Sequence, residues 1–393
     1  MPEPSSVPGT LAEPDVRLLR DVATAVVRLD AVTRLASFSL PYPPQAQRAL
    51  DALVLACLRQ GARPPSGVPE LLRWCRTRPL GSWPLEGLGA ALFDPDDRLI
   101  EPRSGTPTQL CHELAVEGGG DSTTRQYDRI VIHEAMRRCR DANSPESYTA
   151  FRRVLVSRPV LTRADLFDLQ TDLYLDPVME LLELIYVPAP DTYLQGDAYT
   201  PCARCRTLLT PIDQGKWWCE HERCRRLGAP PPGTPLDRED SGEVLHLARP
   251  LRLYVTGPGH AEAELEDALR GLGLTVEMWP GFDAYDLRVT FPDGHVWALD
   301  VKDWAHPGLL GRSAQPVRPE PPYDEACWVV PRVRTDIRRD YLAVYARERK
   351  ERAGGLRLLT DQQVLRAAAA RLYGERGDDS RIAPHSQGGA DHA

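Results

Sequence analysis

Alternating apolar and polar side chains predict a β-hairpin in the last third of the chain. Two stretches rich in β-branched and aromatic residues, 282–291 and 295–303, flank Pro-Asp-Gly at 292–294. This pattern is typical of a hairpin with a three-residue loop. Because successive side chains of a strand point to opposite faces, the apolar positions share one face, which we expect to be buried. That core face consists of Leu287, Val289, Phe291, Trp297, Leu299 and Val301.

The loop also fixes the register of the hairpin. With residues 292–294 as the loop, counting along both arms sets Asp286 directly opposite Asp300. A slip of one residue would place these carboxylates on opposite faces. Lys302 lies two residues beyond Asp300 and therefore on the same face. The sequence thus predicts two acids and one lysine together on the polar face.

The two facing acids predict a metal site. Carboxylates at cross-strand distance repel each other unless a cation lies between them. Mg²⁺ prefers oxygen ligands and is commonly held by one or two carboxylates and a substrate phosphate. We therefore expect Asp286 and Asp300 to bind Mg²⁺ and Lys302 to position the hydrolytic water. The alternative is a solvated polar face with an ordinary Asp–Lys pair.

Helical periodicity dominates residues 1–195, which we expect to be a mostly helical region. Apolar residues recur every three to four positions in 15–38, 45–59, 67–76, 125–140, 147–156, 162–169 and 176–185. These stretches contain no cluster of polar residues with catalytic spacing. A region of this kind most often docks a partner or guides nucleic acid, and the sequence does not specify which.

Two short cysteine pairs follow in residues 196–228. Cys202 and Cys205 are separated by two residues, and Cys219 and Cys224 by four. Paired cysteines supply the four tetrahedral ligands of structural Zn²⁺, so this segment is predicted to be a zinc ribbon with a small hairpin between the pairs. The four-residue spacer is unusual, and His221 is an alternative ligand. With four positions filled, the zinc is expected to be structural.

The remaining chain reads as a linker at 229–242, an α/β domain at 243–374 and a disordered tail at 375–393. Strands are expected at 251–255, 325–330 and 356–359 and helices at 260–272, 335–352 and 360–372. In the helix 260–272, apolar spacing assigns Glu264 to the buried stripe and turns Glu266 and Asp267 outward. Basic residues near the helix 335–352 are candidates for binding nucleic acid. These are Arg332, Arg334, Arg338 and Arg339.

Composition narrows the class of protein. The chain has 393 residues, 42% of them hydrophobic, and a net charge of −8, so contact with nucleic acid requires local basic patches. There is no apolar run of about 20 residues and no apolar segment of the signal-peptide type, so neither a membrane nor secretion is expected. Nine cysteines, four of them clustered, favour a reduced cytoplasm and a metal site over disulfides. We therefore expect a cytoplasmic protein.

The acid and the acid-x-lysine on a hairpin resemble the PD-(D/E)xK nucleases. Further short motifs resemble those of the restriction endonuclease that accompanies a prokaryotic PIWI protein and a helicase in three-gene conflict islands. These motifs are Trp279-Pro280, Tyr285-Asp286-Leu287-Arg288, Asp300-Val301-Lys302-Asp303-Trp304 and Val329-Val330-Pro331. The resemblance covers residues 199–372 and is specific in the hairpin.

The resemblance implies an α/β fold with an αβββαβ restriction-endonuclease-like core in residues 243–374. It also implies a catalytic glutamate from the first helix, at Glu264 with Glu262 as the fallback. The implied function is an antiviral defence nuclease that cuts DNA or an RNA/DNA hybrid together with a PIWI-type protein and a helicase. A homodimer is implied only by analogy. The competing hypothesis is a zinc-ribbon adaptor that binds nucleic acid without cleaving it.

Overall fold

The computed structural model describes residues 13–30, 42–85, 93–117, 123–212, 215–353, 355–374 and 383–384. Contacts divide the chain into two units. Unit 1 comprises residues 1–126, 304–314 and 340–352, and unit 2 comprises 127–303, 315–339 and 353–393. The first 195 residues are therefore shared between the two units rather than forming one region.

Unit 1 is built from helices with a common apolar core. They are α1 (Glu13–Asp30), α2 (Pro44–Arg59), α3 (Val68–Thr77), α4 (Gln109–Glu117), α14 (Pro307–Ser313) and α16 (Tyr341–Glu348). Buried side chains of α1 to α4, such as Leu19, Leu53 and Leu114, pack with Leu309 of α14 in one cluster. The helices expected at 45–59 and 67–76 coincide with α2 and α3, and the described part of the one expected at 15–38 is α1, whereas α4 lies outside the expected helices.

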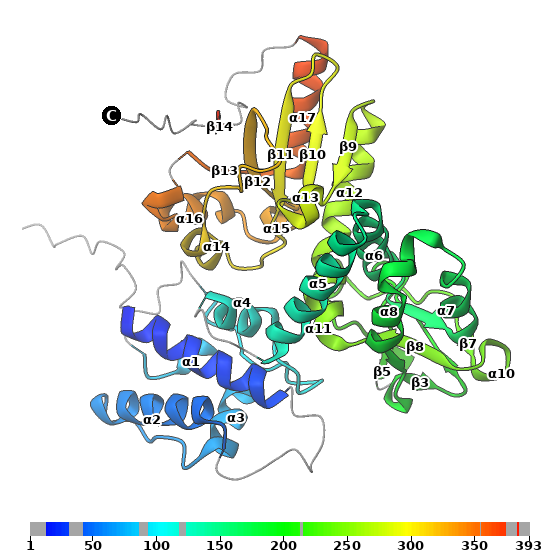
Figure 1. Ribbon diagram of the computed structural model, residues 1–393. Coiled ribbons are helices and arrows are strands. Elements are labelled where there is room, and N and C mark those ends of the chain that lie inside the picture. Colours follow the sequence, from blue (N-terminus) through cyan, green and yellow to red (C-terminus); the bar gives the residue numbers. More distant parts are fainter. Residues whose placement is uncertain are drawn as a thin grey trace, which may run out of the picture. The chain divides into compact units, whose positions relative to one another are not determined.

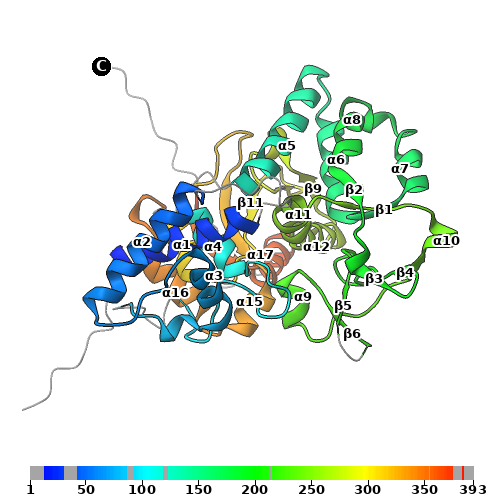
Figure 2. The ribbon, with the colours of Figure 1, turned by 90° about the horizontal axis from the view of Figure 1, so that it is seen from below.

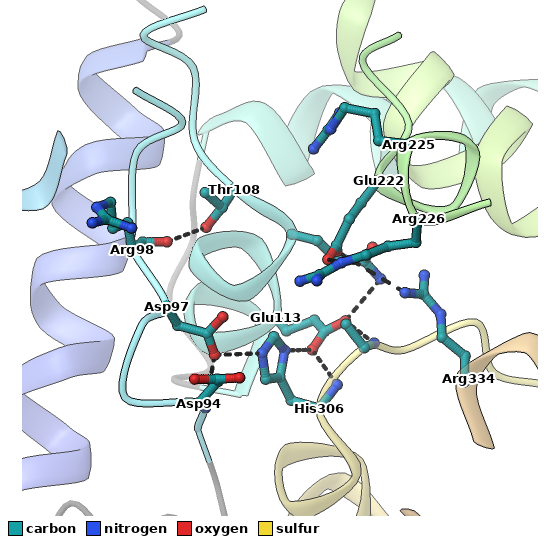
Figure 3. Close-up of polar contacts among 12 residues, drawn as sticks. Asp94, Asp97, Arg98, Thr108, Glu113, Glu222, Arg225, Arg226, His306 and Arg334 are labelled. Atoms are coloured by element: carbon teal, nitrogen blue, oxygen red, sulfur yellow. Dashed lines mark hydrogen bonds and ion pairs between the residues drawn. The ribbon is translucent and has the colours of Figure 1, made fainter. Parts of the chain in front are cut away.

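A buried histidine ties α14 to the rest of unit 1 (Figure 3). His306, which precedes α14, places Nδ1 2.7 Å from Oε2 of Glu113 and Nε2 3.2 Å from Oδ2 of Asp97. Burial alone would lower the pKa of His306, but the two carboxylates raise it to about 10. The imidazole is therefore protonated at neutral pH and makes a charge-assisted contact with each acid.

Unit 2 contains a mixed sheet in the order β13-β12-β11-β10-β9 (Figure 1). The strands β9 (Thr275–Met278), β10 (Leu287–Thr290) and β11 (Val296–Val301) pair antiparallel, whereas β12 (Glu325–Val330) and β13 (Arg357–Thr360) continue in parallel. The core-face residues predicted from the alternation, such as Leu287 and Leu299, are buried. They pack with α12 (Gly257–Gly271) and α17 (Asp361–Tyr373).

The same core extends into helices and strands that come earlier in the chain. These are α5 (Thr123–Asp141), α6 (Pro145–Ser157), β1 (Val160–Thr162), α7 (Arg163–Leu169), α8 (Met179–Ile185), β2 (Tyr186–Pro188) and β8 (Val244–Leu247). The strands β1, β8 and β2 form a separate three-stranded sheet, and α5 and α6 lie side by side (Figure 2). Hence α6 shares one core with the mixed sheet.

The cysteine-rich segment forms the predicted hairpin. The strands β5 (Thr210–Ile212) and β6 (Lys216–Trp218) pair antiparallel, and α9 (Glu222–Arg226) follows. The segment expected as a linker contains β7 (Leu236–Asp237), which pairs with β4 (Ala198–Tyr199), and the short helix α10 (Arg238–Ser241). It therefore carries structure of its own.

Two predicted elements are wrong. Residues 251–255, expected as a strand, belong to a helical stretch made of α11 (Arg249–Leu251), a π-helical turn (Arg252–Thr256) and α12. The basic helix expected at 335–352 is instead α15 (Arg332–Ile337) and α16. The tail at 375–393 lies outside the described residues except for β14 (Ala383–Pro384), which pairs with β12. Among the helices that the structure describes, none combines the length and apolar character needed to cross a bilayer.

Candidate functional site

The hairpin has the predicted register. Leu287 pairs with Leu299 and Thr290 with Val296, and the next position along the ladder sets Asp286 opposite Asp300. Oδ2 of Asp286 accepts a hydrogen bond of 2.6 Å from the backbone N–H of Val301. This bond fixes the first acid to the second strand, directly beside Asp300.

Lys302 completes the group at the end of β11. Its Nζ lies 2.6 Å from Oδ1 of Asp300, and its backbone N–H donates to the carbonyl of Val329 in β12. Burial alone would lower the pKa of Lys302, but Asp300 and Asp286 raise it above its ordinary value. The amine therefore stays protonated, so it can donate hydrogen bonds and offset negative charge but cannot act as a base.

The neighbouring acids change the pKa of Asp286. Burial raises the pKa of Asp286 well above its ordinary value, and the charges of Glu262 and Asp300 raise it further, while Lys302 opposes them. An excess of negative charge in a partly buried place is the condition under which a cation binds. The donor atoms are carboxylate oxygens, which are the ligands that Mg²⁺ prefers.

The first helix supplies a different glutamate from the one expected. Glu264 is exposed and pairs with Arg223 at 2.6 Å, so its assignment to the buried stripe of α12 is wrong. Glu262 is buried and accepts a 2.6 Å hydrogen bond from Nε1 of Trp279. Glu262 and Glu266 share the buried face of α12 with Leu265 and Leu269, so the expectation that Glu266 points outward is also wrong.

A left-handed turn leads into the hairpin and carries another acid. Trp279, Gly281, Phe282 and Asp283 all have positive φ, between 49° and 71°. Asp283 accepts hydrogen bonds from the hydroxyl of Tyr148 at 3.0 Å and from Arg152 at 2.7 Å. The guanidinium of Arg152 also lies 3.6 Å from Glu262.

Sequence reasoning missed Tyr148 and Arg152. Both lie on α6, at positions i and i+4 of a buried face that also holds Phe151 and Leu155. An arginine on an apolar face needs a buried anion. This rule indicates that Arg152 has an anionic partner. It does not identify the partner as Asp283, which is 131 residues away in sequence.

The four cysteines converge as predicted. The Sγ atoms of Cys202, Cys205, Cys219 and Cys224 are buried and lie within 4.8 Å of one another. A tetrahedral zinc with Zn–S bonds of about 2.3 Å would space its sulfurs about 3.8 Å apart, so this donor set fits the ion. These four thiols are close enough together to bind one metal ion, and His221 is not part of the group.

The four candidate arginines are not equivalent. Arg334 is buried and pairs with Asp303 at 2.7 Å, so its guanidinium is not offered to nucleic acid and that assignment is wrong. Arg332 and Arg339 are exposed, and Arg332 pairs with Asp336. Arg338 is partly buried at the end of α15.

The fold and the site define a class: a mixed α/β domain with facing acids and a lysine at the end of one hairpin. Comparison with known families agrees with it. Residues 259–376 match the family described as "REase associating with pPIWI_RE", and residues 18–162 match "pPIWI_RE three-gene island domain Y". These two matches support a restriction-endonuclease-like protein associated with pPIWI-RE, as the sequence resemblance predicts. No curated protein and no solved structure matches it significantly.

Proposed function

We propose that this protein is a Mg²⁺-dependent nuclease of the PD-(D/E)xK type that hydrolyses phosphodiester bonds of DNA, or of an RNA/DNA hybrid. The observation that carries the proposal is the hairpin register, which sets Asp286 beside Asp300 with the amine of Lys302 bonded to the second acid. The match to a restriction-endonuclease family supports the same chemistry. Zinc at the four cysteines has a structural role.

In this proposal each residue of the site has one task. Asp286, Asp300 and Glu262 supply carboxylate oxygens for the ion, which when bound would lower the pKa of a water and polarise the phosphate. Lys302, held protonated by the two aspartates, orients that water and offsets charge on the phosphate oxygens. Arg332 and Arg339 lie on the surface, where they can contact the phosphate backbone.

The proposed biological setting is based on the two family names. Both refer to pPIWI_RE and one to a three-gene island, and we propose that the nuclease acts in such an island in cytoplasmic defence against invading nucleic acid. A PIWI-type protein would be its partner, and a helicase would open the substrate. A homodimer would allow both strands of a duplex to be cut.

Cleavage assays with matched variants test the proposal. Plasmid, single-stranded DNA and an RNA/DNA hybrid are incubated with wild type, Lys302→Ala, Asp300→Asn and Asp293→Asn in Mg²⁺ or in EDTA. Asp293 is an exposed acid in the loop of the same hairpin and serves as the control. We expect the first two variants to lose at least about 10²-fold in rate and the control to match wild type. Equal cutting by Lys302→Ala and wild type would remove the mechanism.

The alternative is an adaptor that binds nucleic acid without cutting it. The feature that favours it is Glu264, which points outward to Arg223 instead of toward the facing acids. Against this, Glu262 of the same helix is a buried carboxylate whose charge acts on Asp286, and it can take the role expected of Glu264 in the enzyme. Binding of all substrates by wild type and variants alike, with no product in Mg²⁺, would establish the adaptor.

A further inference from the structure

Arg152 lies outside the segment that matches the restriction-endonuclease family. It belongs to α6, within the residues 18–162 matched by the domain Y family. Its two acidic contacts, Asp283 and Glu262, lie within the matched residues 259–376. One buried ion cluster of unit 2 therefore joins residues from both families.

The turn that α6 contacts adopts a conformation that needs external support. Trp279, Phe282 and Asp283 have φ of 49°, 60° and 71°, values that side chains other than glycine rarely adopt. Arg152 stacks 4.8 Å from the centre of the Trp279 ring, and Tyr148 packs its ring edge-on to Phe282 at 5.9 Å. With the hydrogen bonds to Asp283, α6 thus contacts each of these three residues.

The helix α6 also packs tightly against α12, which carries Glu262. A Cβ atom on Gly259 would lie 2.3 Å from Cγ2 of Val156, so only glycine permits this approach. The side chain of Arg152 is 8% exposed, and its Nε is buried without an acceptor among the described residues. A buried ion pair with an unmatched N–H contributes little net stability. Stability alone therefore does not account for an arginine at this position.

We propose that α6 is a clamp that positions the carboxylates of the nuclease centre, with Arg152 as its positioning residue. Through Asp283, Arg152 holds the turn from which Asp286 follows three residues later. Through its charge, it keeps Glu262 oriented beside the same site. This inference rests on the proposed nuclease function and deepens it, because the endonuclease-family segment alone then lacks a required part of its centre.

The test compares two adjacent arginines of α6 in the full-length, zinc-loaded protein. Arg152→Met removes the clamp. Arg153→Met removes an ion pair to a buried acid of α12, Glu266, which keeps a second partner, Arg270, at 2.8 Å. It also removes a contact of 5.9 Å with the centre of the Trp279 ring, longer than the 4.8 Å contact of Arg152. Mn²⁺ binding is measured by calorimetry in the absence of nucleic acid, cleavage is measured with Mg²⁺, and unfolding is measured by circular dichroism.

We expect Arg152→Met to weaken Mn²⁺ binding at least about tenfold and to lower kcat about 10²-fold, because small misplacements of reacting groups have effects of that size. Arg153→Met should change neither by more than about twofold. Arg152→Lys should recover part of the loss, because it restores the charge without the planar fork. Equal Mn²⁺ affinity and kcat in the two Met variants would overturn the clamp.

A milder pair of variants covers the case in which Arg152→Met does not fold. Tyr148→Phe removes only the hydroxyl that donates to Asp283, and Tyr186→Phe removes a buried hydroxyl that donates to the carbonyl of Arg158. We expect Tyr148→Phe to weaken Mn²⁺ binding several-fold and Tyr186→Phe to leave it unchanged. Identical affinities in these two variants would also overturn the clamp.

Asp286→Asn separates the two proposals. If wild type cleaves, Asp286→Asn loses Mn²⁺ binding and Arg152→Met behaves as wild type, the clamp is refuted and the nuclease stands. If wild type neither cleaves nor binds Mn²⁺ more tightly than Asp286→Asn, the nuclease is refuted and the clamp with it.

Discussion

Replacing His306 with glutamine should make the stability of unit 1 less dependent on pH. The pKa of His306 is about 10 in the folded protein, against an ordinary value of 6.5. Because the folded value is raised, the stabilisation is complete below pH 6.5 and is lost as the pH rises through 10. Each pKa unit corresponds to about 1.4 kcal/mol, so the full effect is on the order of 3 to 5 kcal/mol.

The assay is urea unfolding of wild type and His306→Gln at intervals from pH 6 to pH 10. Glutamine can still donate to Glu113 or Asp97 but carries no charge. We therefore expect wild type to be the more stable protein at pH 6 and its advantage to shrink by up to about 1.4 kcal/mol per pH unit toward pH 10. Comparing the proteins at each pH cancels the titrations that they share.

His246→Gln is the matched control. His246 is also buried, but burial and the charge of Arg252 lower its pKa to about 3. Its folded form is neutral, so wild type should lose stability relative to this variant only as the pH falls below 6.5. A wild-type advantage over His306→Gln that stays constant from pH 6 to pH 10 would refute the charged histidine in unit 1.

Two further predictions concern the zinc ribbon and the arginines. Removing zinc with a chelator, or replacing Cys219 with serine, should unfold the cysteine-rich segment and lower Tm, because metal binding and folding of such sites are coupled. Mass spectrometry that shows no zinc in the purified protein would contradict this prediction. Arg334→Met should cost about 3 to 5 kcal/mol of unfolding free energy because it removes the 2.7 Å ion pair from the buried carboxylate of Asp303. Arg339→Ala should leave stability unchanged but weaken DNA binding, and the slope of log affinity against log salt concentration should become shallower by about one unit. A binding titration at several salt concentrations measures this slope. Equal stability losses in the two variants would contradict the contrast between these arginines.

The sequence predicts those features that depend on neighbours in the chain. The hairpin register follows from its loop, β12 has the predicted bounds, and α17 lies close to the predicted helix 360–372, with Thr360 and Gln363 forming a capping box at its start. The two cysteine pairs likewise converge, because ligand spacing is a local signal. Each of these features is decided within about twenty residues, a range over which periodicity and spacing are informative.

Features that depend on distant partners escaped prediction. The apolar letters at 251–255 suit a strand, but Arg252 is buried and pairs with Glu220, and the segment continues as a helix into α12. Arg334 looked like a surface charge because Asp303, its buried partner, lies 31 residues away in sequence. Tertiary pairing of this kind overrides local propensity, and a single sequence does not reveal it.

The net charge of the proposed metal centre can be counted from its own residues and from those that contact them. If all are ionised, Glu262, Asp283, Asp286 and Asp300 carry four negative charges, and Arg152 and Lys302 carry two positive ones. The remaining charge of −2 equals that which one divalent cation would balance. The hairpin alone supplies two acids and one lysine, a charge of −1. Glu262 of α12 and Arg152 of α6 cancel each other, and Asp283 in the turn before the hairpin brings the total to −2. The net charge is therefore set by the hairpin and its preceding turn, whereas the two distant helices contribute a pair of opposite charges.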